Sequence, residues 1–332
     1  MGSHLEITKK QQLKAAFTLS FKVLLTGFLL FLIYTEIKER LATTLLSDFQ
    51  HLFLNTQFFL IAALVISLML VNWFLEAYKW QLLVSKVQNI SLSKSFEAIT
   101  SGIATGMFTP NRIGEFAGRV MHLEDGNRMK GAITSLMGSF AQMVVTISFG
   151  ALACTFFLWT QSPFSNVYLN LAIGILLLIG ALSLIFIFLS ENKWVSAFRN
   201  WKFLPKRITQ LLTLPEKFTP AELGITLLLS VFRFVVFNLQ FLLLLWALEV
   251  SISILDALML LPIIFFVQTI IPSVTLAELG VREMVSISIL GLYFSNDIAI
   301  IAASSLLWII NLVLPAVFGS LFLLKTKLFV LR

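Results

Sequence analysis

The chain has 332 residues, of which 58% are hydrophobic and only 12% are charged. A soluble domain has about a quarter charged residues, so this chain has too little charge to cover the surface of a water-soluble globule of its size. The composition excludes a soluble enzyme, a disordered chain and a nucleic-acid-binding domain, and it leaves a polytopic membrane protein. The net charge of +7 then indicates basic residues in cytoplasmic loops rather than contact with nucleic acid.

The start of the chain and its cysteine content say little about the function. Residues 1–4 are typical of an expression-tag remnant, so we treat residues 5–332 as a single transmembrane domain. The one cysteine, Cys154, lies in an apolar run, so neither a disulfide nor a cysteine-based metal cluster can form within one chain. The histidines His51 and His122 are far apart in the sequence. We therefore expect no metal, no cofactor and no catalytic residue.

Six segments are long and apolar enough to cross a bilayer as a helix, which takes about 20 residues. These segments are 15–35, 56–77, 132–159, 167–190, 222–248 and 298–324. Two further segments, 92–120 and 257–293, are apolar but are interrupted by Pro, Gly and charged residues. The sequence thus predicts an all-α protein with about six full spans and two broken ones.

The distribution of basic residues predicts the orientation. With the N-terminus in the cytoplasm, the inner loops hold seventeen Lys and Arg, including Lys79, and the outer loops hold two, Lys38 and Arg40. This asymmetry predicts that both termini are cytoplasmic. Each broken segment must then begin and end on one face of the membrane. We expect two re-entrant helical hairpins that enter from opposite faces, since non-helical backbone at this depth must be buried in protein or line a polar cavity.

The two broken segments carry similar charged clusters. In each, Pro is followed five or six residues later by Glu, and Arg comes four residues after the Glu; the clusters are Pro110, Glu115, Arg119 and Pro272, Glu278, Arg282. Residues four apart share one face of a helix, so each Glu lies beside its Arg. Such clusters in hairpins of opposite orientation predict an inverted repeat with its site near the membrane midplane. Repeat one covers about 56–159 and repeat two about 222–324, joined through 160–221.

The charges in these clusters suggest an anion site. Arg112, Arg119 and Arg282, together with the N-termini of the returning helices, favour an anion such as phosphate. The alternative is that each Glu–Arg pair only neutralises itself and pins its hairpin, because a charge in the membrane interior costs at least about 2.5–3.5 kcal/mol. Arg112 and Glu283 lie outside the two Glu–Arg pairs, which favours the functional interpretation.

One more charge lies inside a predicted span. Arg233 falls about a third of the way through segment 222–248. An intramembrane Arg usually faces the bundle interior and a carboxylate, and Glu115, Glu278 and Glu283 are its candidate partners. Three polar residues in other apolar segments either line the interior or bond neighbouring helices, and we favour the packing role for them: Gln142, Gln268 and Asn311.

The charged clusters resemble those of a known family, the integral-membrane region of the lysylphosphatidylglycerol synthases and flippases. Its Pro-Gly-x-x-Gly-Glu-x-x-x-Arg pattern is similar to 110–119 (PNRIGEFAGR), and its Pro-Gly-Gly-x-Gly-x-Arg-Glu pattern is similar to 276–283 (LAELGVRE). The segment 72–83 also looks like the family's Arg/Lys-Trp-x-x-Leu segment. The resemblance extends over about 56–324. It implies a stand-alone member, without the synthase domain, in the bacterial inner (cytoplasmic) membrane.

The resemblance implies movement of lipids with large polar headgroups between leaflets. We therefore expect a lipid flippase rather than an enzyme. It would carry an anionic phospholipid, a glycolipid or a prenyl-phosphate lipid through a polar cavity between the hairpins. The expected substrate-binding residues are Arg112, Glu115, Arg119, Arg233, Glu278, Arg282 and Glu283. Alternatives are a membrane transferase or hydrolase acting on a lipid phosphate, a lipid-binding scaffold that serves a partner membrane enzyme, and a transporter of a soluble metabolite.

Overall fold

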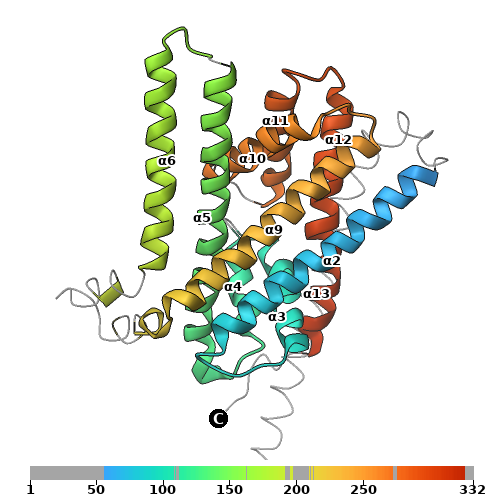
Figure 1. Ribbon diagram of the computed structural model, residues 1–332. Coiled ribbons are helices and arrows are strands. Elements are labelled where there is room, and N and C mark those ends of the chain that lie inside the picture. The colour runs from blue at the N-terminus through green and yellow to red at the C-terminus, as the bar shows by residue number, and fades with distance from the viewer. Residues whose placement is uncertain are drawn as a thin grey trace, which may run out of the picture.

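The computed structural model describes residues 56–107, 109, 112–161, 163–190, 195–196, 209, 211, 213–271 and 275–325, with only the backbone described at 275–278 and 324–325. All regular structure within these ranges is helical (Figure 1). The predicted span at 15–35 and both chain ends lie outside the described residues.

Long apolar helices confirm five of the six predicted spans. They are α2 (Thr56–Val84), α5 (Arg128–Gln161), α6 (Val167–Leu189), α9 (Pro220–Ala247) and a continuous helix made of α12 (Asp297–Trp308), the π-helical turn η5 (Ile309–Val313) and α13 (Leu314–Lys325). All five are long and apolar enough to cross a membrane. The chain is therefore an all-α, multi-pass membrane protein.

The π-helical turn has a local cause in the sequence. Pro315, two residues after the turn, has no N–H to donate to the carbonyl of Asn311, which lies four residues earlier. The helix widens over Ile309–Val313 instead of keeping the regular α-helical pattern. Asn311 is thereby placed on the inner side of the bundle, where it is buried.

Both broken segments fold as two helices with a break between them. The first forms α3 (Leu92–Gly106) and α4 (Gly114–Val120), and the second forms α10 (Ile254–Ile270) and α11 (Thr275–Leu290). The helices of each pair contact one another, and the two pairs lie at opposite ends of the bundle (Figure 1). A long helix, a broken pair and another long helix thus follow one another twice along the chain. The predicted repeat, its inverted orientation and the re-entry of the hairpins stay predictions.

Several helix starts are fixed by local sequence. Thr219 and Glu222 form a capping box at α9, with Pro220 in the first helical turn. The hydroxyl of Ser91 accepts a hydrogen bond from the backbone N–H of Lys94 at the start of α3. These caps satisfy backbone groups that the first turn of a helix leaves without partners.

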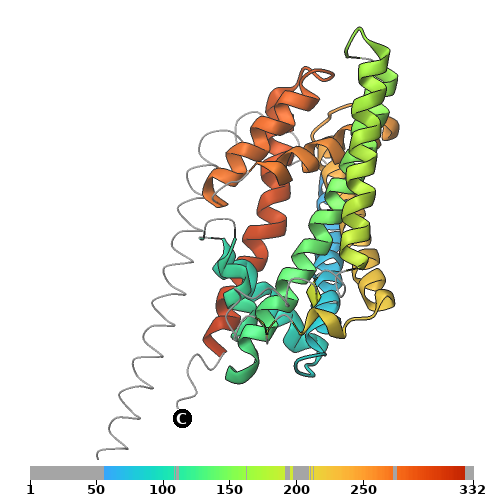
Figure 2. The same ribbon diagram turned by 90° about the vertical axis from the view of Figure 1, so that its left-hand side faces the viewer.

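The bundle has an apolar outer surface, and its interior holds buried polar residues beside hydrophobic clusters. Helix α6 stands beside α5 at the edge of the bundle (Figure 2), and most of its Leu and Ile side chains are exposed, as expected of a lipid-facing helix. Helices α2 and α9 run side by side through the middle (Figure 1). The buried faces of these two helices carry polar residues, and this is where the cavity forms.

The end of α2 corrects one expectation. Segment 56–77 was expected to end before Lys79, which was counted among the basic residues of the inner loops. Helix α2 continues to Val84, and the side chain of Lys79 is fully buried. The assignment of Lys79 to a loop was wrong, because an ammonium group can be buried where it has carboxylate and hydroxyl partners. The predicted orientation of the termini rests on the other sixteen Lys and Arg residues of the predicted inner loops.

Candidate functional site: a charged cavity between the helices

A cavity of about 460 Å³ lies among α2, α5, α9, η5 and the two broken segments. Three residues that line it, Gln142, Arg233 and Asn311, lie close to the middle of α5, α9 and the continuous helix 297–325. The middle of a spanning helix lies near the centre of the bilayer. The cavity therefore lies at the depth where charged groups are most expensive and most often functional.

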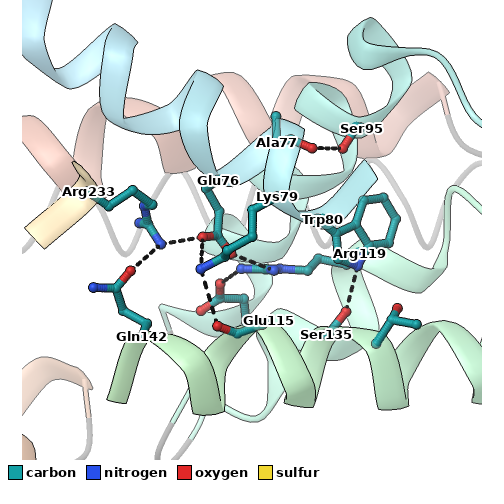
Figure 3. Close-up of polar contacts among 12 residues, drawn as sticks. Glu76, Ala77, Lys79, Trp80, Ser95, Glu115, Arg119, Ser135, Gln142 and Arg233 are labelled. Atoms are coloured by element: carbon teal, nitrogen blue, oxygen red, sulfur yellow. Dashed lines mark hydrogen bonds and ion pairs between the residues drawn. The ribbon is translucent and has the colours of Figure 1, made fainter. Parts of the chain in front are cut away.

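The carboxylate of Glu76 lies at the centre of the charged residues (Figure 3). Its Oε1 accepts from Nη1 of Arg119 at 2.9 Å, and its Oε2 accepts from Nζ of Lys79 at 2.7 Å. Oε2 also accepts from Nη1 of Arg233. Glu76 thus joins α2 to α4 and α9, and a single carboxylate serves three cations.

Lys79 has a full set of partners. Besides Glu76, its ammonium donates to the carbonyl of Gly138 at 3.2 Å and to the hydroxyl of Ser230 at 3.3 Å. An ammonium has three N–H donors, and all three are used here. Lys79 therefore contributes positive charge to the cavity and holds α2 against α5 and α9, but it has no donor left for a ligand.

The first broken segment supplies a second carboxylate. Arg119 is ion-paired with Glu115 on the same face of α4, as the spacing predicted. Nη2 of Arg112 lies 3.3 Å from Oε2 of Glu115, so this carboxylate also serves two cations. Arg112 has a positive φ of 56°, which is uncommon for a residue other than glycine and is often found at functional sites.

Two glycines let α4 lie directly against α3. A Cβ atom at Gly118 would lie 2.6 Å from the backbone oxygen of Ser101 and 2.2 Å from Oγ1 of Thr105. A Cβ atom at Gly102 would lie 2.8 Å from Cγ of Arg119. No side chain larger than hydrogen fits at these positions without a shift of α4. The glycines therefore set the position of Glu115 and Arg119 in the cavity.

Amides surround Arg233 on its other sides. Its Nε donates to Oδ1 of Asn72 at 2.8 Å, and its Nη1 lies 3.4 Å from Oε1 of Gln142 (Figure 3). Nδ2 of Asn72 in turn donates to Oδ1 of Asn311 at 3.3 Å. Gln142 and Asn311 thus bond to neighbouring helices and also line the cavity, so the favoured packing role describes only part of what they do.

Aromatic rings form the apolar wall of the cavity. The ring of Phe265 on α10 lies 6.3 Å from that of Phe234 and 6.4 Å from that of Phe237, both on α9. The guanidinium of Arg233 lies over the ring of Phe237 at 5.9 Å, a favourable cation–π distance. The cavity thus has one charged side and one aromatic side, as a site for a ligand with a charged and an apolar part would need.

The second broken segment contributes less to the charged side. Arg282 lines the cavity, and its backbone carbonyl accepts from Nε2 of Gln268 at 3.5 Å. Oε1 of Glu283 accepts from the hydroxyl of Ser305 at 2.6 Å, on the side toward α12. The side chain of Glu278 lies outside the described residues, so its predicted pairing with Arg282 stays a prediction.

Five of the seven predicted site residues line the cavity: Arg112, Glu115, Arg119, Arg233 and Arg282. The partner found for Arg233 is Glu76, which was not among the three candidates. Glu76 and Lys79 were both missed as site residues. Their signal was present, since they lie three residues apart within an apolar stretch that continues to Val84. Among the described residues, no three His, Cys, Asp or Glu side chains are placed to hold a metal ion.

Comparison with known proteins gives one match. The family model for the transmembrane (TM) region of lysylphosphatidylglycerol synthase matches residues 17–321. No curated protein and no solved structure matches the chain. The match covers most of the sequence, including both broken segments and all five described spans, and it indicates a membrane-lipid-related function. The chain therefore belongs to the lysylphosphatidylglycerol synthase TM-region family.

Proposed function

We propose that this protein is a lipid transporter, not an enzyme, which moves a lipid with an anionic headgroup between the leaflets of the bacterial inner membrane. The observation that carries the proposal is the cavity itself. It lies at the middle of the spans. Among the side chains that the structure describes, five cations line it (Lys79, Arg112, Arg119, Arg233 and Arg282) with two carboxylates, Glu76 and Glu115. Positive potential at this depth favours an anionic headgroup over a neutral or cationic one.

The aromatic wall supports a lipid rather than a soluble anion. A site for a small soluble anion needs only polar groups, whereas Phe234, Phe237 and Phe265 give this cavity an apolar side. We propose that the headgroup occupies the charged side while the lipid tails lie along the aromatic side and the surrounding membrane. In this proposal the two broken segments are re-entrant hairpins from opposite faces, and each closes the cavity toward one leaflet.

Transport can be tested in vesicles. The protein would be reconstituted into phosphatidylcholine vesicles that contain fluorescently labelled phosphatidic acid or phosphatidylglycerol. A membrane-impermeant reductant would then bleach only the label that reaches the outer leaflet. We expect wild-type protein to make the label of both leaflets accessible. Bleaching limited to the outer leaflet for every anionic lipid would contradict the proposal.

Variants locate the activity within the cavity. Arg119→Gln and Arg112→Gln each remove a cation from the charged side, and we expect both to abolish transport or reduce it strongly. Arg112 is the safer change for folding, because its side chain is 30% exposed. Lys86→Gln is the matched control, since Lys86 is 31% exposed and ion-paired with Glu222 away from the cavity. Equal transport by all three variants would place the pathway elsewhere.

The orientation and the hairpins can be tested by labelling cysteines introduced at chosen positions. In a Cys154→Ser background, a cysteine at Lys130 is expected to be labelled from the cytoplasmic side only. A cysteine at Leu292, in the exposed turn after α11, is expected to be labelled from the opposite side. Labelling of both positions from one side would contradict the proposed topology.

A further inference from the structure

We propose that the cavity selects a phosphate monoester headgroup, which carries close to two negative charges, over a phosphodiester or a cationic aminoacyl headgroup. This inference rests on the proposed function, because it concerns the headgroup of the lipid assigned to the same cavity. It follows from the charge of one connected set of side chains, here called the ion network: Glu76, Lys79, Arg112, Glu115, Arg119 and Arg233.

The ion network has more cations than carboxylates. Glu76 pairs with Lys79, Arg119 and Arg233, and Glu115 pairs with Arg112 and Arg119, so continuous ion pairs connect all six residues. The four cations share two carboxylates, which leaves two positive charges in excess within the network. This count includes only side chains that the structure describes.

Part of the excess charge is buried. The side chains of Lys79 and Arg119 are 1% and 3% exposed, whereas those of Arg233 and Arg112 are 16% and 30% exposed at the cavity. Each uncompensated charge in a membrane interior costs at least about 2.5–3.5 kcal/mol. A ligand that supplies two negative charges in one group removes this cost for both excess cations. A ligand with one negative charge removes it for only one of them, and a cationic headgroup increases it.

A phosphate monoester has the matching charge. It carries about −1.5 to −2 at pH 7 and presents three strong acceptor oxygens. A phosphodiester keeps a single ionisable oxygen and therefore a single negative charge. An aminoacyl group esterified to a phosphodiester lipid adds an ammonium, which makes the headgroup a poor match for a cavity with an excess of cations.

Two arginines of the ion network also have an N–H donor that a ligand could use. The Nε atoms of Arg112 and Arg119 are buried and have no hydrogen-bond partner among the described residues. A guanidinium holds phosphate through N–H donors in a fixed planar arrangement. A buried N–H without a partner is costly, so a phosphate oxygen that accepts from it is favoured over a neutral group. The Nε–H donors of the two arginines and the excess positive charge of the network thus both favour a phosphate group.

Competition binding on the purified full chain tests the selectivity. Dioleoyl phosphatidic acid is a monoester lipid, and dioleoyl phosphatidylglycerol is a diester lipid with the same tails. We expect phosphatidic acid to bind about tenfold tighter or more, the ratio that corresponds to 1.4 kcal/mol. Farnesyl phosphate should also bind better than the diester, and lysylphosphatidylglycerol should bind worst. Equal affinity for the monoester and the diester would overturn the inference.

Three variants separate the charge from other effects. Arg112→Gln lowers the excess to one positive charge, so the preference for the monoester should fall several-fold. Arg112→Lys keeps the charge and should restore most of the preference. Lys86→Gln should leave the preference unchanged. Thermal unfolding of each variant shows that the protein is folded. An unchanged preference in Arg112→Gln would overturn the charge-matching argument.

The outcomes also separate this inference from the proposed function. Transport of phosphatidylglycerol with no preference for monoesters would overturn only the inference. Binding of inorganic phosphate as tightly as phosphatidic acid would assign the ion network to a soluble anion and overturn its assignment to a lipid. If neither lipids nor phosphate bind, both the inference and the proposed function fail.

Discussion

The guanidinium of Arg233 on α9 is ion-paired with the carboxylate of Glu76 on α2, 157 positions earlier in the sequence. Both side chains line the cavity inside the bundle, and that of Glu76 is only 5% exposed. Glu76 also pairs with Lys79 and Arg119. This one carboxylate therefore determines how three cations are placed around the cavity.

Removal of the negative charge of Glu76 is expected to destabilise the protein strongly. Glu76→Gln keeps the shape of the side chain but leaves Lys79, Arg119 and Arg233 buried with one carboxylate fewer. Loss of one partner of a buried ion pair costs about 3–5 kcal/mol. Thermal unfolding in detergent, followed by tryptophan fluorescence, should show a large decrease in melting temperature. Glu124→Gln, at an exposed carboxylate, is the control, and an equally small effect of both changes would contradict the central role of Glu76.

Arg233 is not expected to be replaceable by lysine. Its guanidinium bonds Asn72 through Nε and Glu76 and Gln142 through Nη1. An ammonium is more compact and cannot reach all three partners in this arrangement. Arg233→Lys should lose about 1.5–3 kcal/mol of stability, the value of a hydrogen bond to a charged group, and most of the transport. Lys86→Arg at an exposed pair should change neither, and wild-type transport by Arg233→Lys would show that charge alone suffices at this position.

A methyl group at Gly118 is expected to displace α4. The added Cβ would collide with the backbone oxygen of Ser101, and overpacking of this kind costs about 1–3 kcal/mol. Because α4 carries Glu115 and Arg119, Gly118→Ala should also impair lipid transport. Gly180→Ala on α6 is the matched control, since a Cβ there meets nothing within 4 Å. The control should be neutral or slightly stabilising, and equal melting temperatures for the two variants would contradict the close packing of α3 on α4.

His122 is expected to make the protein less stable in acid. Burial, together with the positive charge of Lys94, lowers the pKa of His122 from 6.5 to about 4. Its Nε2 lies 2.9 Å from the hydroxyl of Ser101. A lowered pKa means that the unfolded chain binds a proton more readily than the folded one. The stabilisation is therefore complete above pH 6.5 and is lost as the pH falls toward 4, by about 2 kcal/mol at pH 5.

The control for this pH dependence is a variant without a titratable group. His122→Gln can keep a hydrogen bond to Ser101 but does not titrate. The decrease in melting temperature between pH 7 and pH 5 should be smaller in this variant than in the wild type. The same decrease in both proteins would show that other groups cause the acid sensitivity.

Local patterns were sufficient to predict the spans and the first charged cluster. A bilayer requires about 20 apolar residues in each spanning helix, and this uniform requirement makes α5, α6 and α9 visible in the sequence. The pair Glu115 and Arg119 was predictable because four residues make about one turn of a helix.

The centre of the site could not be predicted in the same way. Arg119 and Arg233, two of the partners of Glu76, lie 43 and 157 positions away from it, and no local spacing connects them to it. Lys79 was misassigned because a lysine near the end of an apolar segment usually marks the membrane surface. The structure shows that this lysine is neutralised by Glu76 on the same helix and is further held by groups on α5 and α9, which only the tertiary fold brings together.

The spacing of Glu76 and Lys79 has a consequence for the synthesis of the protein. Helix α2 precedes α4 and α9 in the chain, so Glu76 and Lys79 are made before Arg119 and Arg233. Lys79 lies one turn from Glu76 and pairs with it within the same helix, so a nascent α2 already carries balanced charges. The lysine can thus act as a temporary counter-ion during insertion, and the two arginines join the carboxylate as the later helices assemble around it.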